Sequence, residues 1–181
     1  LPDDVDAIVA STLAEGGTIG DMVTQLIATI GENMMVRRSA TFSVSPGAIG
    51  AYIHNAIAPD LGKIGVLVAL ESTGDVGKLQ ELGKQLAMHV AAANPQALDP
   101  TSLDPAVVQR EREVMADKYR QQGKPENMIE KIANGKVNKF YVEYTLLNQE
   151  FIKDDKKTVR QYLESVDKNI KVTAMKRIKI G

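Results

Sequence analysis

The sequence predicts an α+β protein in which strands and helices form a core and two further helices protrude from it as a hairpin. Three observations indicate this fold class. Residues 49–53 and 64–70 are rich in apolar and β-branched residues, as in paired strands. Residues 75–93 carry apolar side chains three and four positions apart, as in a helix with one buried face. Residues 105–140 repeat that spacing among abundant charges, which predicts helices with a narrow contact seam.

The composition is that of an ordinary globular protein. Its 181 residues are 44% hydrophobic, enough to bury one core, or one core with an appendage. The 22 basic residues nearly cancel the 23 acidic ones, so no overall field would hold the chain on nucleic acid or on an anionic membrane. We therefore expect no direct nucleic-acid partner and no membrane.

Several site classes and targeting segments have no counterpart in the sequence. No apolar run approaches the ~20 residues of a membrane-spanning helix. The chain has no cysteine, which excludes disulfides, thiolate metal sites and cysteine nucleophiles. The first residues lack an initiator Met and a basic-then-apolar signal pattern. We expect Leu1 to be an internal starting point of a longer protein.

A helix and a strand are predicted in the first quarter of the chain. Thr18 is suited to cap a helix whose apolar residues recur at three- and four-residue spacing and which ends near Gly31. Residues 34–44 mix β-branched and apolar residues with two arginines, which predicts a strand closed by the turn at residues 45–47.

The two central strands should form an antiparallel hairpin. The loop between residues 53 and 64 contains Pro59, Asp60 and Gly62, which are all turn residues. The helix over residues 75–93 should cover this hairpin, because its apolar positions lie on one face and residues 94–95 stop the pattern.

The next two helices should pack mainly on each other. Asp104 and Pro105 provide an N-cap and a first-turn proline, and the break at residues 123–125 precedes a second helix near Glu126. The narrow apolar stripe predicts an antiparallel coiled-coil hairpin that projects from the core. A last helix over residues 159–166 and a strand over residues 170–180 should complete the sheet.

Candidate catalytic residues are few. His54 and His89 are the only histidines and lie far apart in the sequence, so each is interpreted as a packed or capping imidazole, with a partner contact or a catalytic role as the alternative. No serine lies in a nucleophile elbow, and no acidic cluster brings enough oxygen ligands for a cation. We therefore expect no catalytic residue, no metal and no cofactor. Residues 105–140 carry eight basic and five acidic residues, which leaves an RNA contact open as a minor reading.

Four ordered segments resemble translation elongation factor Ts. The first runs from Tyr52 through His54 to the strand beginning Gly62-Lys63-Ile64-Gly65, and the second is Met88-His89-Val90 before Asn94-Pro95. The third lies at residues 123–140, and the fourth at residues 146–159. Together these segments extend over most of the chain.

The resemblance implies a fold and a domain layout. It implies antiparallel sheets packed with helices in two core subdomains, with a coiled-coil hairpin inserted into the second. By position, residues 1–45 would end the first subdomain. Residues 46–100 and 141–181 would form the second, and residues 101–140 would be the inserted hairpin.

The resemblance also implies a function. Members of this family are not enzymes in the chemical sense: they bind elongation factor Tu and promote GDP release during protein synthesis, as guanine nucleotide exchange factors. Carried over by position, the partner-binding residues are Ile30, Gly31 and His54. The family's Thr-Asp-Phe-Val motif, which acts beside the partner's Mg²⁺ and nucleotide, would lie upstream of Leu1. The absence of this motif is one difference from the family. Another is the loop at residues 55–61, which is longer than the short glycine turn of many members.

Two other function classes stay open beside the exchange factor. One is an RNA-binding or ribosome-associated module that uses the basic hairpin, and the other is a hydrolase without a recognised motif. The expected location is the bacterial cytoplasm, with an organelle matrix as the alternative. The sequence leaves the oligomeric state undetermined.

Overall fold

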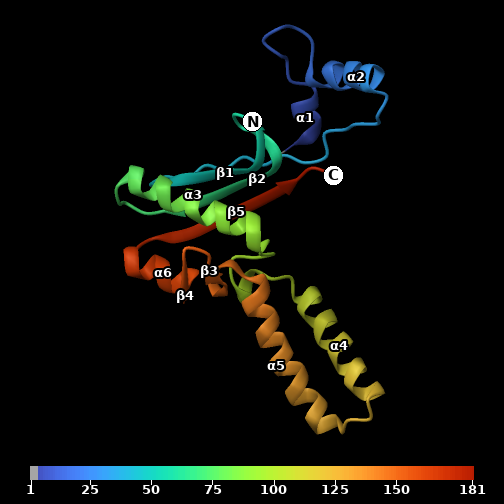
Figure 1. The fold of residues 1–181 in the computed structure, drawn as a ribbon, viewed down its shortest axis with the longest axis vertical. Helices are drawn as coiled ribbons and strands as arrows, with labels where there is room; N and C mark the ends of the chain where they lie inside the picture. Colours follow the sequence, from blue (N-terminus) through green and yellow to red (C-terminus); the bar gives the residue numbers. More distant parts are fainter. Residues whose placement is uncertain (1–3) are drawn as a thin grey trace. The chain divides into compact units, whose positions relative to one another are not determined.

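The computed structural model describes residues 4–181 and divides the chain into two compact units. The first unit ends at Ser43 and the second spans Val44–Gly181, and each is described by itself. Figure 1 shows the elements of both units along the chain. Helices and antiparallel sheets together make this an α+β protein, as the sequence predicted.

The first unit contains two helices, α1 (Val5–Val9) and α2 (Ile19–Ile30). Thr18 and Asp21 form a capping box at the start of α2: each side chain accepts a hydrogen bond from the other residue's backbone N–H. The two bonds are 2.8 and 3.1 Å long. The bond from the Thr18 N–H, joined by a 2.8 Å bond from the Thr18 hydroxyl to the same carboxylate, lowers the pKa of Asp21, because both bonds stabilise the charged form. The predicted start of this helix is therefore confirmed.

The strand predicted over residues 34–44 is wrong. This segment has no helix or strand assignment, although its β-branched residues fit a strand. A strand is stable only when its N–H and C=O groups form a ladder with a neighbouring strand. Within residues 4–181, no strand is paired with this segment, so its side-chain composition alone does not make it a strand.

A three-stranded antiparallel sheet forms the centre of the second unit. Its order is β1-β2-β5, with β1 at Gly47–Ala58, β2 at Leu61–Glu71 and β5 at Lys171–Lys179. The predicted hairpin and the predicted closing strand are thus both confirmed. The loop expected between residues 53 and 64 is much shorter, because pairing continues past a bulge to the pair Ala58 and Leu61.

Helix α3 (Val76–Ala93) packs on one face of this sheet (Figure 1). Asp75 caps its start with a 2.8 Å bond from the Lys78 N–H, and Asn94 ends it in the left-handed conformation. Its apolar residues fill a core with those of β2. The fully buried members of this core include Val68, Leu70, Leu86, Val90, Leu146, Phe151 and Val159.

Two glycines allow α3 to lie directly against β1. A Cβ atom on Gly50 of β1 would overlap the backbone carbonyl group of Gly83 in α3. A Cβ on Gly83 would come to 2.8 Å from the Gly50 Cα. This contact brings helix and sheet closer than any side chain would permit.

Helices α4 (Pro105–Gln121) and α5 (Glu126–Tyr144) form an antiparallel hairpin that projects from the sheet (Figure 1). Asp104 caps α4, and Ile129 and Ala133 are the buried residues of α5. At the tip, the Arg120 guanidinium bonds to Asp117 at 2.8 Å and to Glu126 at 2.6 Å. The predicted helical pair is confirmed, whereas its description as a coiled coil stays a prediction.

The remaining elements connect the hairpin to the sheet. Three-residue 3₁₀ helices lie at Pro100–Ser102 and Leu146–Asn148, one on each side of the hairpin. Strands β3 (Glu150–Phe151) and β4 (Asp154–Thr158) pair with each other, and α6 (Val159–Val166) follows. Phe151 of β3 is fully buried, so this short segment contributes to the core.

Candidate partner-binding surface

Ile30 and Gly31 form the C-terminal end of α2. Gly31 adopts φ = 78°, a left-handed conformation that glycine reaches without steric cost, and its N–H donates a 2.9 Å bond to the Ile27 carbonyl. Ile30, in the last turn, is 56% exposed. The helix end therefore presents a large apolar side chain to solvent beside an uncovered backbone turn.

His54 lies on β1, opposite Ile64 of β2 and close to the tip of the strand hairpin. Its ring is half-buried, and its Nδ1 is 3.2 Å from the Tyr52 hydroxyl. The two rings are tilted, with centroids 5.9 Å apart. This neighbour holds the His54 ring in place while leaving part of it open to a partner.

The tip of the strand hairpin carries exposed apolar residues that the sequence did not single out. Ile57 is 75% exposed and Leu61 is 53% exposed, on either side of the turn at Pro59 and Asp60. A concavity of about 590 Å³ runs along β1 beside this tip, from Ala51 to Asp60. In the sequence, large apolar residues on both sides of a tight turn are the pattern that could have indicated this exposed surface. A turn that contacts only water usually carries polar residues at such positions.

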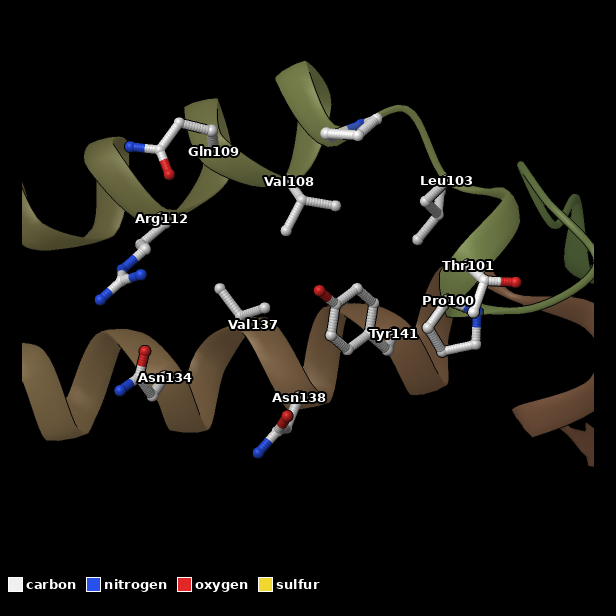
Figure 2. Close-up of a pocket in the computed structure, with 11 residues that line it drawn as sticks. Pro100, Thr101, Leu103, Val108, Gln109, Arg112, Asn134, Val137, Asn138 and Tyr141 are labelled. Carbon is white, nitrogen blue, oxygen red and sulfur yellow. The ribbon is translucent and has the colours of Figure 1, made fainter.

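A second hollow lies at the foot of the helical hairpin, with a volume of about 570 Å³. Figure 2 shows Val108 of α4 and Val137 of α5 pointing toward each other across it, with the ring of Tyr141 beside them. Arg112 extends from α4 toward α5 and is the charged residue of the lining. None of the three predicted contact residues lines this hollow.

The structure places the predicted contact residues in different units. Ile30 and Gly31 are adjacent at the end of one helix in the first unit. His54 belongs to the second unit, so the three residues are supported by separate local structures. All three lie at the end of an element or near its exposed tip, where a partner has access.

His89, the other histidine, is buried in α3 and is 1% exposed. Its Nε2 is 2.8 Å from the Gln149 Oε1, and its Nδ1 accepts a 3.3 Å bond from the Ile152 N–H. Burial lowers the pKa of His89 below its usual 6.5, and the bond to Gln149 opposes this in part. Folding therefore favours the neutral form of the His89 imidazole over the protonated form.

This burial predicts a loss of stability in mild acid. The unfolded chain binds a proton at His89 near pH 6.5, but the folded chain binds it only at lower pH, so stability is full above pH 6.5 and falls below it. The free energy of unfolding should decrease by at most about 1.4 kcal/mol per pH unit from this group. Urea unfolding between pH 7 and 5.5 measures the slope, and His89→Gln, which cannot titrate, should show a flatter one. Equal slopes would contradict the prediction.

Between residues 4 and 181, no group of three or more His, Asp or Glu side chains is placed to hold a metal ion. In the same part of the chain, no helix has both the length and the apolar composition needed to cross a membrane.

Comparison with known proteins gives one consistent result. The family model described as "Elongation factor TS" matches residues 1–181. The protein named "Elongation factor Ts" from Rhodopseudomonas palustris strain TIE-1 is 56% identical over 183 residues, which cover 98% of this chain and 59% of the relative. The protein of that name from Rhodospirillum centenum is 47% identical, covering 99% of this chain and 60% of the relative. That from Caulobacter vibrioides is 51% identical over 166 residues, covering 92% and 53%. The chain thus spans about three-fifths or less of these relatives.

Proposed function

The chain belongs to the elongation factor Ts family, and from this premise we propose that it binds elongation factor Tu and promotes GDP release during protein synthesis. The observation that carries the proposal is the match of the family model to all 181 residues. The relatives' identities of 47 to 56% support it, because they extend over nearly the whole chain.

The proposed mechanism requires no chemical step by this chain. An exchange factor promotes GDP release when it binds the nucleotide-free partner more tightly than the GDP-bound partner. Its binding then lowers the partner's affinity for GDP. By thermodynamic linkage, GDP then weakens the exchange factor's binding by the same factor. What this chain must supply is a surface that fits one state of the partner better than the other.

We propose two contact regions, one in each unit: the end of α2 and the tip of the β1–β2 hairpin. Ile30 is exposed and apolar, and Gly31 leaves the backbone open to close approach. His54 offers a ring that is partly packed and partly accessible. Apolar and aromatic side chains that are held in place before binding lose little conformational entropy in a complex, so they suit an interface.

The substitution His54→Ala is expected to weaken binding to elongation factor Tu by about 1 to 2 kcal/mol, the range of a moderate interface residue. The fold should be retained, because the ring is only half-buried and its side-chain bond is to the neighbouring Tyr52. Calorimetric titration of purified elongation factor Tu measures the affinity, and circular dichroism checks the fold. Unchanged affinity in a folded variant would assign His54 a purely structural role.

The RNA-binding alternative receives less support from the hairpin's charges. Arg120 forms ion pairs with Asp117 and Glu126, and Lys139 lies 3.6 Å from Glu143. Part of the basic charge is thus already neutralised within the hairpin, which reduces its attraction for phosphate groups.

A pull-down from a bacterial lysate separates the two functions. Immobilised chain should recover elongation factor Tu, and the recovery should persist after nuclease treatment and fall when GDP is added in excess. Recovery of ribosomal material that disappears with nuclease, without elongation factor Tu, would instead support the RNA-binding function.

A further inference from the structure

We propose that His89 and Gln149 are positioning residues: their side chains form a clasp that fixes the direction in which the α4–α5 hairpin leaves the core. The clasp joins α3, a helix packed on the sheet, to the last turn of α5. The two residues are 60 positions apart in the sequence and are both buried.

The hydrogen bonds of the clasp run in one direction. The Ile152 N–H donates to His89 Nδ1 at 3.3 Å, so the ring proton is on Nε2. His89 Nε2–H then donates to Gln149 Oε1 at 2.8 Å. This orientation of the amide leaves Gln149 Nε2 as a donor, and it bonds to the Glu143 carbonyl at 2.6 Å. Each group therefore has the role that its neighbour requires.

The last bond of this series satisfies a backbone group of α5. The final carbonyls of an α-helix have no partner within the helix and must be bonded elsewhere. Tyr141 and Tyr144 bond to nearby backbone N–H groups of residues 145, 96 and 97. The Glu143 carbonyl is instead bonded by the Gln149 side chain, which is in turn held by the core helix.

The backbone bonds at this place have a different effect. The Leu146 N–H donates to the Ala97 carbonyl at 2.9 Å, and the Leu147 N–H donates to the Leu98 carbonyl at 2.9 Å. These bonds join the segment that enters the hairpin to the segment that leaves it. The side-chain clasp connects the end of α5 to α3 itself, whereas the Tyr144 carbonyl is bonded by the N–H groups of Gln96 and Ala97, which follow α3.

The surroundings make the clasp strong and its loss costly. The Phe151 ring, which is fully buried, has its centroid 5.8 Å from that of His89. Hydrogen bonds are stronger where water is excluded, and a buried polar group without a partner is correspondingly unfavourable. A hairpin that moved away would break the bond between Gln149 Nε2 and the Glu143 carbonyl, whereas His89 keeps the Gln149 amide oriented toward that carbonyl, so the clasp favours one direction.

Two substitutions of His89 each remove a different one of its two hydrogen bonds. The amide nitrogen of glutamine can occupy the place of Nε2, so His89→Gln keeps the donor to Gln149 and loses the acceptor for Ile152. Asparagine is shorter and reaches only the place of Nδ1, so His89→Asn keeps the Ile152 half and loses the Gln149 half. Both variants leave one buried group unpaired, which makes them matched controls for each other.

The test is a distance measurement between spin labels on the chain alone. The chain has no cysteine, so Lys84→Cys in α3 and Lys131→Cys in α5 place two labels without competing sites. Both positions are exposed. Pulsed electron–electron double resonance then measures the distribution of distances between the label on α3 and the label on α5.

The expected result is a narrow distribution for the parent and for His89→Gln. His89→Asn and Gln149→Met should give a roughly twofold broader or shifted distribution, because the hairpin can then move as a rigid body. Leu82→Ala, which leaves a cavity in α3 outside the clasp, should stay narrow although it lowers stability. Equal distributions for His89→Gln and His89→Asn, whether narrow or broad, would overturn the proposal, as would broadening by Leu82→Ala.

A fixed direction would hold the hairpin ready to bind a partner. That this partner is elongation factor Tu rests on the proposed function. The distance measurement needs no partner, so failure of the clasp and failure of the proposed function are distinguishable.

Discussion

Gly50→Ala is expected to lower the free energy of unfolding by about 3 kcal/mol, at the upper end of the usual cost of overpacking. The new methyl group would overlap the backbone of Gly83. Backbone atoms cannot rotate away as a side chain does, so α3 must move off the sheet and weaken the packing of Leu86 and Val90. Urea unfolding followed by circular dichroism measures the change.

Gly135→Ala is the matched control. Gly135 lies inside α5, and a Cβ built there meets no atom within 4 Å. The same substitution should therefore raise stability by about 0.8 kcal/mol, because alanine favours the helix more than glycine does. A Gly50→Ala protein as stable as the parent would show that β1 and α3 do not approach each other as closely as described.

Ile30→Asp is expected to reduce affinity for elongation factor Tu about 100-fold, equal to about 2.7 kcal/mol. Ile30 is 56% exposed, so the fold loses little when it is replaced. In the complex, however, the substitution would remove an apolar contact and bury a carboxylate without a partner, which is costly. Calorimetric titration at constant salt measures the affinity.

Val76→Asp provides the control for this charge change. Val76 is 53% exposed, close to the value for Ile30, and it is the first residue of α3. A carboxylate is favourable at a helix N-terminus, so this variant should stay folded. It adds the same charge at a residue that is not one of the three proposed contacts, so it should bind as the parent does. Equal losses for both variants would indicate a nonspecific effect of charge.

The helices of this protein could be predicted because their signals are local. Thr18 caps α2, as predicted. Asp75, the first residue of the helix predicted over residues 75–93, caps α3, and the helix at Val159–Val166 has the predicted bounds. Caps and apolar spacing act within a few residues, so the sequence contains them directly. The match to the elongation factor Ts family was also predictable, because its motifs are short and ordered.

Strand errors have a non-local cause. Residues 34–44 have the composition of a strand, but the described residues provide no strand to pair with them. The β1–β2 hairpin was predicted with strands that were too short. Asn55 and Asp60 adopt positive φ angles of 52° and 58°, so they accommodate a bulged strand and a tight turn that their composition had indicated as a loop.

The clasp lay beyond sequence reasoning for the same kind of reason. His89 and Gln149 each fall in a recognised motif, but nothing in either motif indicates that their side chains meet. The exposed residues Ile57 and Leu61 were missed because their role depends on the turn geometry. Their side chains are now natural additions to the proposed contact surface around His54.

The central claim is that this chain accelerates nucleotide release from elongation factor Tu. Stopped-flow fluorescence, with elongation factor Tu preloaded with a fluorescent GDP and mixed with excess unlabelled GDP, measures the release rate directly. The account predicts that the rate rises with the concentration of this 181-residue chain and reaches a plateau, and that Ile30→Asp shifts the rise to higher concentration. A release rate that stays at its spontaneous value, at concentrations where calorimetry shows the complex to be formed, would contradict it.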